Sequence, residues 1–199
     1  SAPEQASSGW MLEHRFNEAF TVRQNARYAW IENNQMGAYG AGCVNAGASD
    51  LLSRVGDMGR SSTSAFAIDN QAQFKADTGP FAHTFLVGTD FRYGRLQDKG
   101  GDDGDFPPID VFNPVYGARA PEFELYGDSF SEQKQTGVYA QDQIKLGRWA
   151  LTLGGRYDWA NTDTRDYLEN TRDLQKDKAF TGRAGLSYLF DNGLAPYVS

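Results

Sequence analysis

Histidine and cysteine, the side chains best suited to a zinc site, are scarce in this sequence. His14 and His83 lie far apart, with no histidine or cysteine at ligand spacing from either. Cys43 is the single cysteine, which excludes an internal disulfide and any CxxC motif. Both histidines fall among alternating aromatic residues. We therefore interpret them as members of strand faces rather than as metal ligands or catalytic bases.

Carboxylates gather in the glycine-rich segment from Asp98 to Asp105. Between Gly94 and Glu132 there are nine acidic and three basic residues, so this stretch carries a net charge of −6 in a chain whose total is −7. It superficially resembles a calcium loop, but it lacks the alternating ligands and the final bidentate Glu that such a loop requires. The favoured interpretation is a solvated acidic loop, with divalent-cation binding as the alternative.

Motifs for catalysis and nucleotide binding are absent from the sequence. Gly40-Ala41-Gly42 is followed by Asn45 where a dinucleotide fingerprint needs its third glycine. Neither a GxSxG elbow nor an HExxH helix occurs. The net negative charge disfavours a nucleic-acid partner, which calls for clustered Lys and Arg. We predict a protein that is not an enzyme and that uses no cofactor, resident metal or nucleic acid.

Apolar residues recur at every second position in much of the chain, as in half-buried β-strands. In the clearest case, Leu151, Leu153, Tyr157 and Trp159 share one face of a predicted strand over residues 150–160. The eight predicted strands cover residues 10–16, 20–30, 64–77, 81–93, 134–146, 150–160, 179–190 and 194–199. No stretch approaches 18 consecutive apolar residues and the first residues lack the features of a signal peptide, so we expect no membrane helix.

The connections between these strands alternate between short and long. Short ones are predicted at residues 17–19, 78–80, 147–148 and 191–193, and long ones at 31–63, 94–133 and 161–178. Loops above about 15 residues are uncommon in compact domains, whereas transmembrane barrels combine short turns at one rim with long loops at the other. Aromatic residues near the strand ends fit the interfacial girdles of such barrels. The predicted fold class is an all-β, antiparallel up-and-down transmembrane β-barrel.

Five motifs are distributed over nearly the full length: LEHRFN with FTVRQN (residues 12–25), IDVFNPV (109–115), QTGVYAQDQ (135–143), LTLGGRYDWA (151–160) and YLFDNGLAPY (188–197). As a set they resemble the TonB-dependent outer-membrane receptors for ferric siderophores, and within these the ferrichrome and ferric-hydroxamate receptors. The resemblance implies a barrel of about 22 strands in the outer membrane of a Gram-negative bacterium. It also implies an N-terminal plug domain that binds the TonB complex.

The resemblance implies that residues 1–199 are a partial barrel domain of about eight strands, with the plug domain absent. Such a segment would contact outer-membrane lipid and a ferric siderophore, with iron entering only as the siderophore chelate. It would not transport iron by itself. Coupling to TonB would require the plug of the full-length protein.

Ligand contacts carry over from the resemblance at two positions. Tyr39 in Tyr39-Gly40-Ala41-Gly42-Cys43 corresponds to a Tyr-Gly-Tyr-Gly segment that touches the siderophore, but Ala41 replaces the second tyrosine. A second contact falls near Gly100, where Phe106 is the nearest aromatic residue. These departures favour hydroxamate siderophores as a class over ferrichrome itself. Cys43 lacks the loop partner of the resembling receptors and is expected to be a free thiol.

Two alternatives stay open at the level of sequence. A complete eight-stranded outer-membrane barrel would have a structural or adhesive role, with an interior filled by ion pairs among Arg23, Arg27, Arg92, Arg156, Asp90 and Asp158. A soluble sandwich or lipocalin-like ligand-binding barrel would show the same strand alternation, with the apolar faces turned inward.

Overall fold

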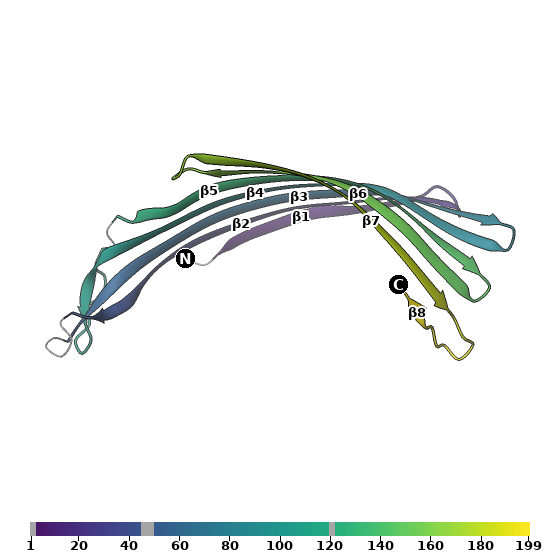
Figure 1. Cartoon of the computed structure of the whole chain (residues 1–199). Helices are drawn as coiled ribbons and strands as arrows, with labels where there is room; N and C mark the ends of the chain where they lie inside the picture. The colour runs from purple at the N-terminus through teal and green to yellow at the C-terminus, as the bar shows by residue number, and fades with distance from the viewer. Residues whose placement is uncertain (1–2, 45–49, 120–121) are drawn as a thin grey trace.

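The computed structural model describes residues 3–44, 50–119 and 122–199, which form a single curved antiparallel sheet (Figure 1). The strands pair in chain order, each with its sequence neighbours. They are β1 (Glu4–Arg15), β2 (Phe20–Cys43), β3 (Leu51–Thr78), β4 (Phe81–Asp110), β5 (Glu124–Leu146), β6 (Trp149–Asp166), β7 (Thr171–Tyr188) and β8 (Tyr197–Val198).

The connections at one rim are as tight as the sequence predicts. Asn17 accepts hydrogen bonds from the backbone N–H groups of Ala19 and Phe20, which closes the first turn with a side chain. Gly79 and Gly147 have φ values of 63° and 55°, a region that favours glycine, and each lies in a turn of two residues. The connection before β8 is longer and includes the predicted turn at residues 191–193.

The predicted long loops are wrong over most of their length. β2 and β3 remain paired from Phe20↔Phe74 to Cys43↔Leu52, and the two hairpins that follow are similarly extended (Figure 1). The connecting segments at that rim shrink to residues 44–50, 111–123 and 167–170. Both faces of these extensions carry mixed polar residues, so the hydrogen-bonded ladder continues where the period-2 hydrophobic signal has already stopped.

The sheet has one apolar and one polar face near the tight turns. The apolar face presents Trp10, Phe74, Phe85, Phe91, Leu153, Trp159 and Phe180, all exposed. The polar face carries residues from the alternate positions, among them Arg23, Asp69, Asp90 and Arg156. A strand of about 9–11 residues crosses a bilayer. Since β4 has 30 residues, it extends far beyond the apolar belt.

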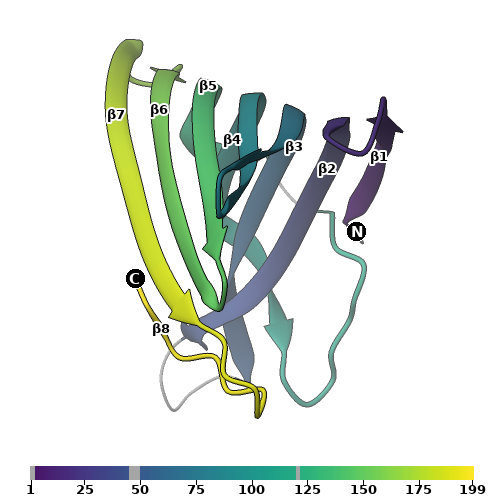
Figure 2. The ribbon, with the colours of Figure 1, turned by 90° about the vertical axis from the view of Figure 1, so that its right-hand side faces the viewer.

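The sheet is open: β1 and β8 lie at opposite edges and do not pair (Figure 2). The alternative of a closed eight-stranded barrel is therefore wrong. The described residues also form no enclosed apolar core, because Ala26 and Met58 are their only buried hydrophobic residues. An inward-facing apolar side, as the soluble alternative requires, is not what this sheet has.

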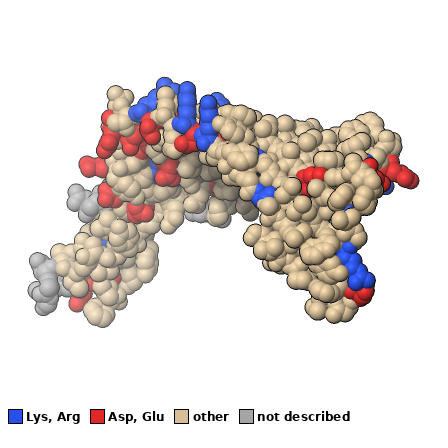
Figure 3. Space-filling view, turned by 45° about the vertical axis from the view of Figure 1, so that its right-hand side comes forward, with Lys and Arg blue, Asp and Glu red and all other residues tan. Residues whose placement is uncertain are grey.

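Charged side chains gather toward the ends of the sheet, with few in the middle of the face shown in Figure 3. Among the described residues, no helix has the length and hydropathy needed to span a membrane.

Candidate functional site

The centre of the polar face is organised around Arg156 on β6. Its guanidinium donates to Asp90 of β4 at 2.5 and 3.1 Å and to Asp158 of its own strand at 2.5 to 3.0 Å. Asp90 is nearly inaccessible, with 8% of its side chain exposed. Gln135 donates to Asp158 at 3.0 Å. The cluster therefore places the Asp90 charge where charge-assisted hydrogen bonds compensate its burial.

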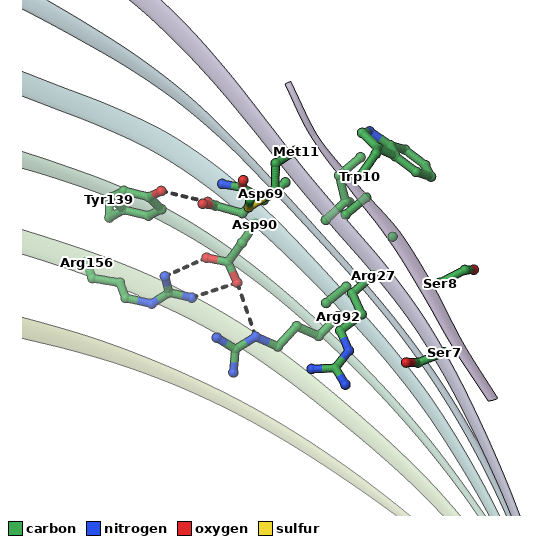
Figure 4. Close-up of a pocket in the computed structure, with 15 residues that line it drawn as sticks. Ser7, Ser8, Trp10, Met11, Arg27, Asp69, Asp90, Arg92, Tyr139 and Arg156 are labelled. Carbon is green, nitrogen blue, oxygen red and sulfur yellow. Dashed lines mark hydrogen bonds and ion pairs between the residues drawn. The ribbon is translucent and has the colours of Figure 1, made fainter. Parts of the chain in front are cut away.

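Long side chains on this face lie across glycines of the preceding strand. The Tyr139 ring on β5 covers Gly88 of β4, and its hydroxyl donates to Asp69 of β3 at 2.6 Å (Figure 4). A Cβ on Gly88 would overlap that ring. The same arrangement recurs one strand further along, where Arg156 crosses Gly137 to reach Asp90.

A third bridge of this kind joins β7 to β5, since Arg183 lies over Gly154 and donates to Gln141. In all three cases a glycine on the intervening strand lets a side chain span two strand spacings, about 10 Å. The side chains of the polar face therefore lie flat against the sheet and cross-link its strands, which leaves open space next to this face. The sequence placed Arg156 and Asp90 in one possible ion-pair cluster but did not predict the bridges from Tyr139 to Asp69 and from Arg183 to Gln141. The signal for all three is glycine at polar-face positions, which can be interpreted only once the register between the strands is known.

A hollow of about 740 Å³ adjoins the Arg156 cluster, within the range of small-molecule sites. Its lining includes Asp69, Asp90 and Tyr139, together with Arg27 and Arg92. Figure 4 shows both of these arginines on the same side of the strands as Asp90, whereas Trp10 points away. The arrangement suits reversible binding of a polar ligand rather than bond-making chemistry.

Tyr39 lies in β2 rather than in a loop, opposite Val55 of β3. Strand alternation places it on the same side as the polar face, near the rim with the long hairpins. The residue is 57% exposed. Farther down that side, Tyr126 donates to Asp57 at 3.4 Å, and the Asp57 carboxylate raises the pKa of Tyr126 above its ordinary value. Tyr39 and Tyr126 can each offer a ring and a hydroxyl group to a ligand on this side of the sheet.

Phe106 lies in β4 opposite Arg54, whose guanidinium stands 4.8 Å from the ring centroid. A Cβ on Gly56 would approach the Phe106 ring within 2.9 Å, so the ring packs over this glycine on the side continuous with the apolar face. Two register shifts around Arg54 separate this part of β4 from the regular alternation below. The structure thus brings Tyr39 and Phe106 to one rim but not to one side of the sheet.

An ionic cluster joins β4 and β5 beyond the apolar belt. Glu132 accepts from Tyr93 at 2.6 Å and from Arg95 at 3.4 Å, and it pairs with Lys134 at 2.7 Å. The Lys134 hydrogen bond, followed by that of Tyr93, lowers the pKa of Glu132 to about 2. Glu132 is therefore ionised at any ordinary pH and ties the two strands together.

The other residues singled out from the sequence take structural positions. His14 and His83 lie on the apolar face, and His83 contacts Asp142 and Thr78 at 2.8 Å each. The acidic segment 98–105 is part of β4 rather than a loop, and the side chains of residues 103–105 lie outside the described ones. Cys43 is exposed and unpaired. Within the described ranges, no three His, Cys, Asp or Glu side chains are grouped to hold a metal ion.

Comparison with known proteins gives a consistent family. The family described as "TonB dependent receptor-like, beta-barrel" matches residues 2–199. The "Ferrioxamine B receptor" of Salmonella typhimurium (strain SL1344) is 43% identical over 192 residues, covering 96% of this chain and 27% of that protein. The "Ferrichrome outer membrane transporter/phage receptor" of Escherichia coli (strain K12) is 37% identical over 213 residues, covering 96% of this chain and 28% of its own length. The chain thus spans about a quarter of these relatives.

Among solved structures, the closed form of the ferric-catecholate import receptor Fiu from E. coli K12 superposes with a TM-score of 0.77 at 14% identity. The match covers 98% of this chain and 32% of that one. At this identity the likeness concerns the fold alone.

Proposed function

Because the chain belongs to the TonB-dependent receptor-like β-barrel family, we propose that it forms part of the wall of an outer-membrane receptor that takes up ferric siderophores of the hydroxamate class. The observation that carries the substrate class is the 43% identity to a ferrioxamine B receptor over 96% of the chain. The family consists of receptors and transporters, in agreement with the prediction that the protein is not an enzyme.

The two faces of the sheet support this role. The apolar face would contact outer-membrane lipid, and the polar face with the Arg156 cluster would line the interior of the complete barrel. A ferric siderophore would then be held by aromatic contacts and by hydrogen bonds to its oxygen atoms. The siderophore itself keeps the iron, so the wall needs no metal ligands.

We propose that residues 1–199 belong to the barrel domain and that a separate plug domain of the full-length receptor contacts the TonB complex. Energy from that contact would rearrange the plug and release the siderophore inward. The wall contributes binding and orientation only.

Tyr39 and Phe106 are the proposed ligand contacts of this segment. The position of Tyr39 on the side of the polar face supports its role, because a ligand entering the barrel from the long-hairpin rim would pass it. Phe106 lies toward the other side of the sheet and would reach the ligand only where the rim folds inward. Tyr39 therefore carries the proposal.

Equilibrium binding of ferrioxamine B and ferrichrome to the full-length receptor in detergent tests this function. We expect Tyr39→Ala to weaken binding about tenfold, the effect of losing roughly 1.4 kcal/mol of aromatic contact. Tyr28→Ala is the matched control, because Tyr28 is an exposed tyrosine of the same strand on the apolar face. Unchanged affinity in Tyr39→Ala would remove Tyr39 from the site, and a receptor that binds no ferric hydroxamate would contradict the function.

A further inference from the structure

Apart from Arg15 at the tight-turn rim, five arginines of the polar face fall into two groups. Three of them are tied to the wall: Arg23 donates to Glu13 and Gln73, Arg156 to Asp90 and Asp158, and Arg183 to Gln141. These guanidinium groups are therefore already supplied with acceptors. They stabilise the sheet and have little left to offer a ligand.

Arg27 and Arg92 differ from the other three. In the described part of the chain, the Arg27 side chain has no hydrogen-bond or ion-pair partner, and it is exposed on the polar face. Arg92 makes one long contact to Asp90, 3.7 Å from its Nε, and 64% of its side chain is exposed. Asp90 is engaged more closely by Arg156, so most of the Arg92 donors stay free.

The register sets these two arginines opposite one another. Ala67 of β3 pairs with Arg27 of β2 on one side and with Arg92 of β4 on the other. The two backbones are thus about 10 Å apart, a span that two arginine side chains can close onto a single group. Ala67 is small enough to leave the space between them open, and both arginines line the 740 Å³ hollow.

The two positive charges repel each other across Ala67, and a negatively charged group between them would be attracted to both. Asp69 lines the same hollow but is held by Tyr139 and Gln71, and no ion pair joins it to either arginine. Among the described residues, the wall therefore supplies Arg92 with the distant Asp90 carboxylate and supplies Arg27 with none. The planar fork of each guanidinium matches the two oxygens of a carboxylate.

We propose that Arg27 and Arg92 form a subsite for a carboxylate group inside the barrel. Two sources would present the same chemistry there: a ferric siderophore with a carboxylate tail, or an acidic side chain of the protein segment that occupies the barrel interior. This subsite rests on the proposed function, which places the polar face inside the barrel.

The experiment compares the full-length receptor with the double variant Arg27→Gln, Arg92→Gln and with Arg183→Gln, a matched control that removes one wall-tied arginine. The probes are ferrioxamine B, whose tail ends in an ammonium group, and its succinyl derivative, whose tail ends in a carboxylate. If the siderophore is the source, the double variant binds the succinyl chelate about tenfold more weakly, while its affinity for ferrioxamine B and both affinities of Arg183→Gln stay unchanged.

A second arm addresses the protein source. If an acidic side chain of the interior segment occupies the subsite, limited proteolysis cleaves that segment several times faster in the double variant than in Arg183→Gln, and the two chelates do not differ. The proposal is overturned if the double variant matches Arg183→Gln in both arms. A receptor that binds neither chelate contradicts the proposed function instead, and the proteolysis arm still decides the subsite.

Discussion

Three glycines of the polar face, Gly88, Gly137 and Gly154, each lie directly beneath a side chain of the next strand. The Tyr139 ring lies over Gly88 and donates a hydrogen bond to Asp69. We therefore expect Gly88→Ala to displace the ring, break this hydrogen bond and lower the free energy of unfolding by about 1–3 kcal/mol. Urea unfolding of the receptor in detergent measures this. Gly94→Ala is the control on the same strand and face, because a Cβ there meets nothing within 4 Å. Equal urea midpoints for Gly88→Ala and Gly94→Ala would show that the space above Gly88 is not needed for stability.

The Arg156 cluster allows a second prediction at the scale of single residues. Arg156→Gln would leave the buried Asp90 without its closest donors, at a cost of about 2 kcal/mol in unfolding free energy. The exposed pair of Arg172 with Asp163 is screened by solvent and should contribute less than the Arg156 cluster, so Arg172→Gln is the comparison. The urea midpoints of the two variants, measured under the same conditions, test this prediction. A larger loss of stability in Arg172→Gln than in Arg156→Gln would contradict it.

Strand alternation alone places Arg23, Arg27, Arg92, Arg156, Asp90 and Asp158 on one face, and the structure confirms that placement. Their pairing could not be predicted, because it depends on the register between strands. Arg23 forms an ion pair with Glu13 instead of joining the central cluster, and the Arg27 side chain forms no ion pair within the described ranges. Phe106 shows a second limit: irregularities near Arg54 shift the register, and a one-residue shift moves a side chain to the other face.

At the scale of the strand, the sequence predicts the tight-turn ends well and the far ends poorly. β2 begins at Phe20 as predicted but ends at Cys43 rather than at Trp30. The hydrophobic alternation ends where the strand leaves the apolar belt, while the backbone hydrogen bonds to β3 continue. Hydrophobic alternation reflects the burial of one face, so it gives no information on backbone pairing where both faces of the strand lie in water.

The extension of the β4–β5 hairpin should depend on pH through Glu132. Its pKa is lowered to about 2 in the folded state from an ordinary value of 4.5, so its stabilising contribution is complete above pH 4.5 and disappears as the pH falls toward 2. We expect the hairpin to resist pepsin at pH 4 and to be cleaved near pH 2. Comparison with Glu132→Gln at the same pH removes the pH dependence of pepsin itself: the wild type should be cleaved more slowly than the variant at pH 4 and at the same rate near pH 2. A wild-type hairpin equally resistant at pH 2 would contradict this role.

At the scale of the whole molecule, the open sheet has consequences at both edges. β1 and β8 each pair on one side only, and unpaired backbone groups in lipid cost several kcal/mol each. The remaining strands of a complete barrel would satisfy them. The resemblance of the motifs predicts this family and fold, and both are confirmed by the match over residues 2–199.

The central claim is that the apolar face of this sheet contacts lipid while the polar face contacts water. Spin labels on single cysteines along β6 test it most directly, in the full-length receptor carrying Cys43→Ser and reconstituted in bilayers. We predict that labels at Leu151 and Leu153 are relaxed mainly by oxygen, which partitions into lipid, and that a label at Thr152 between them is relaxed mainly by a water-soluble nickel complex. The reverse alternation, or none, would contradict the account.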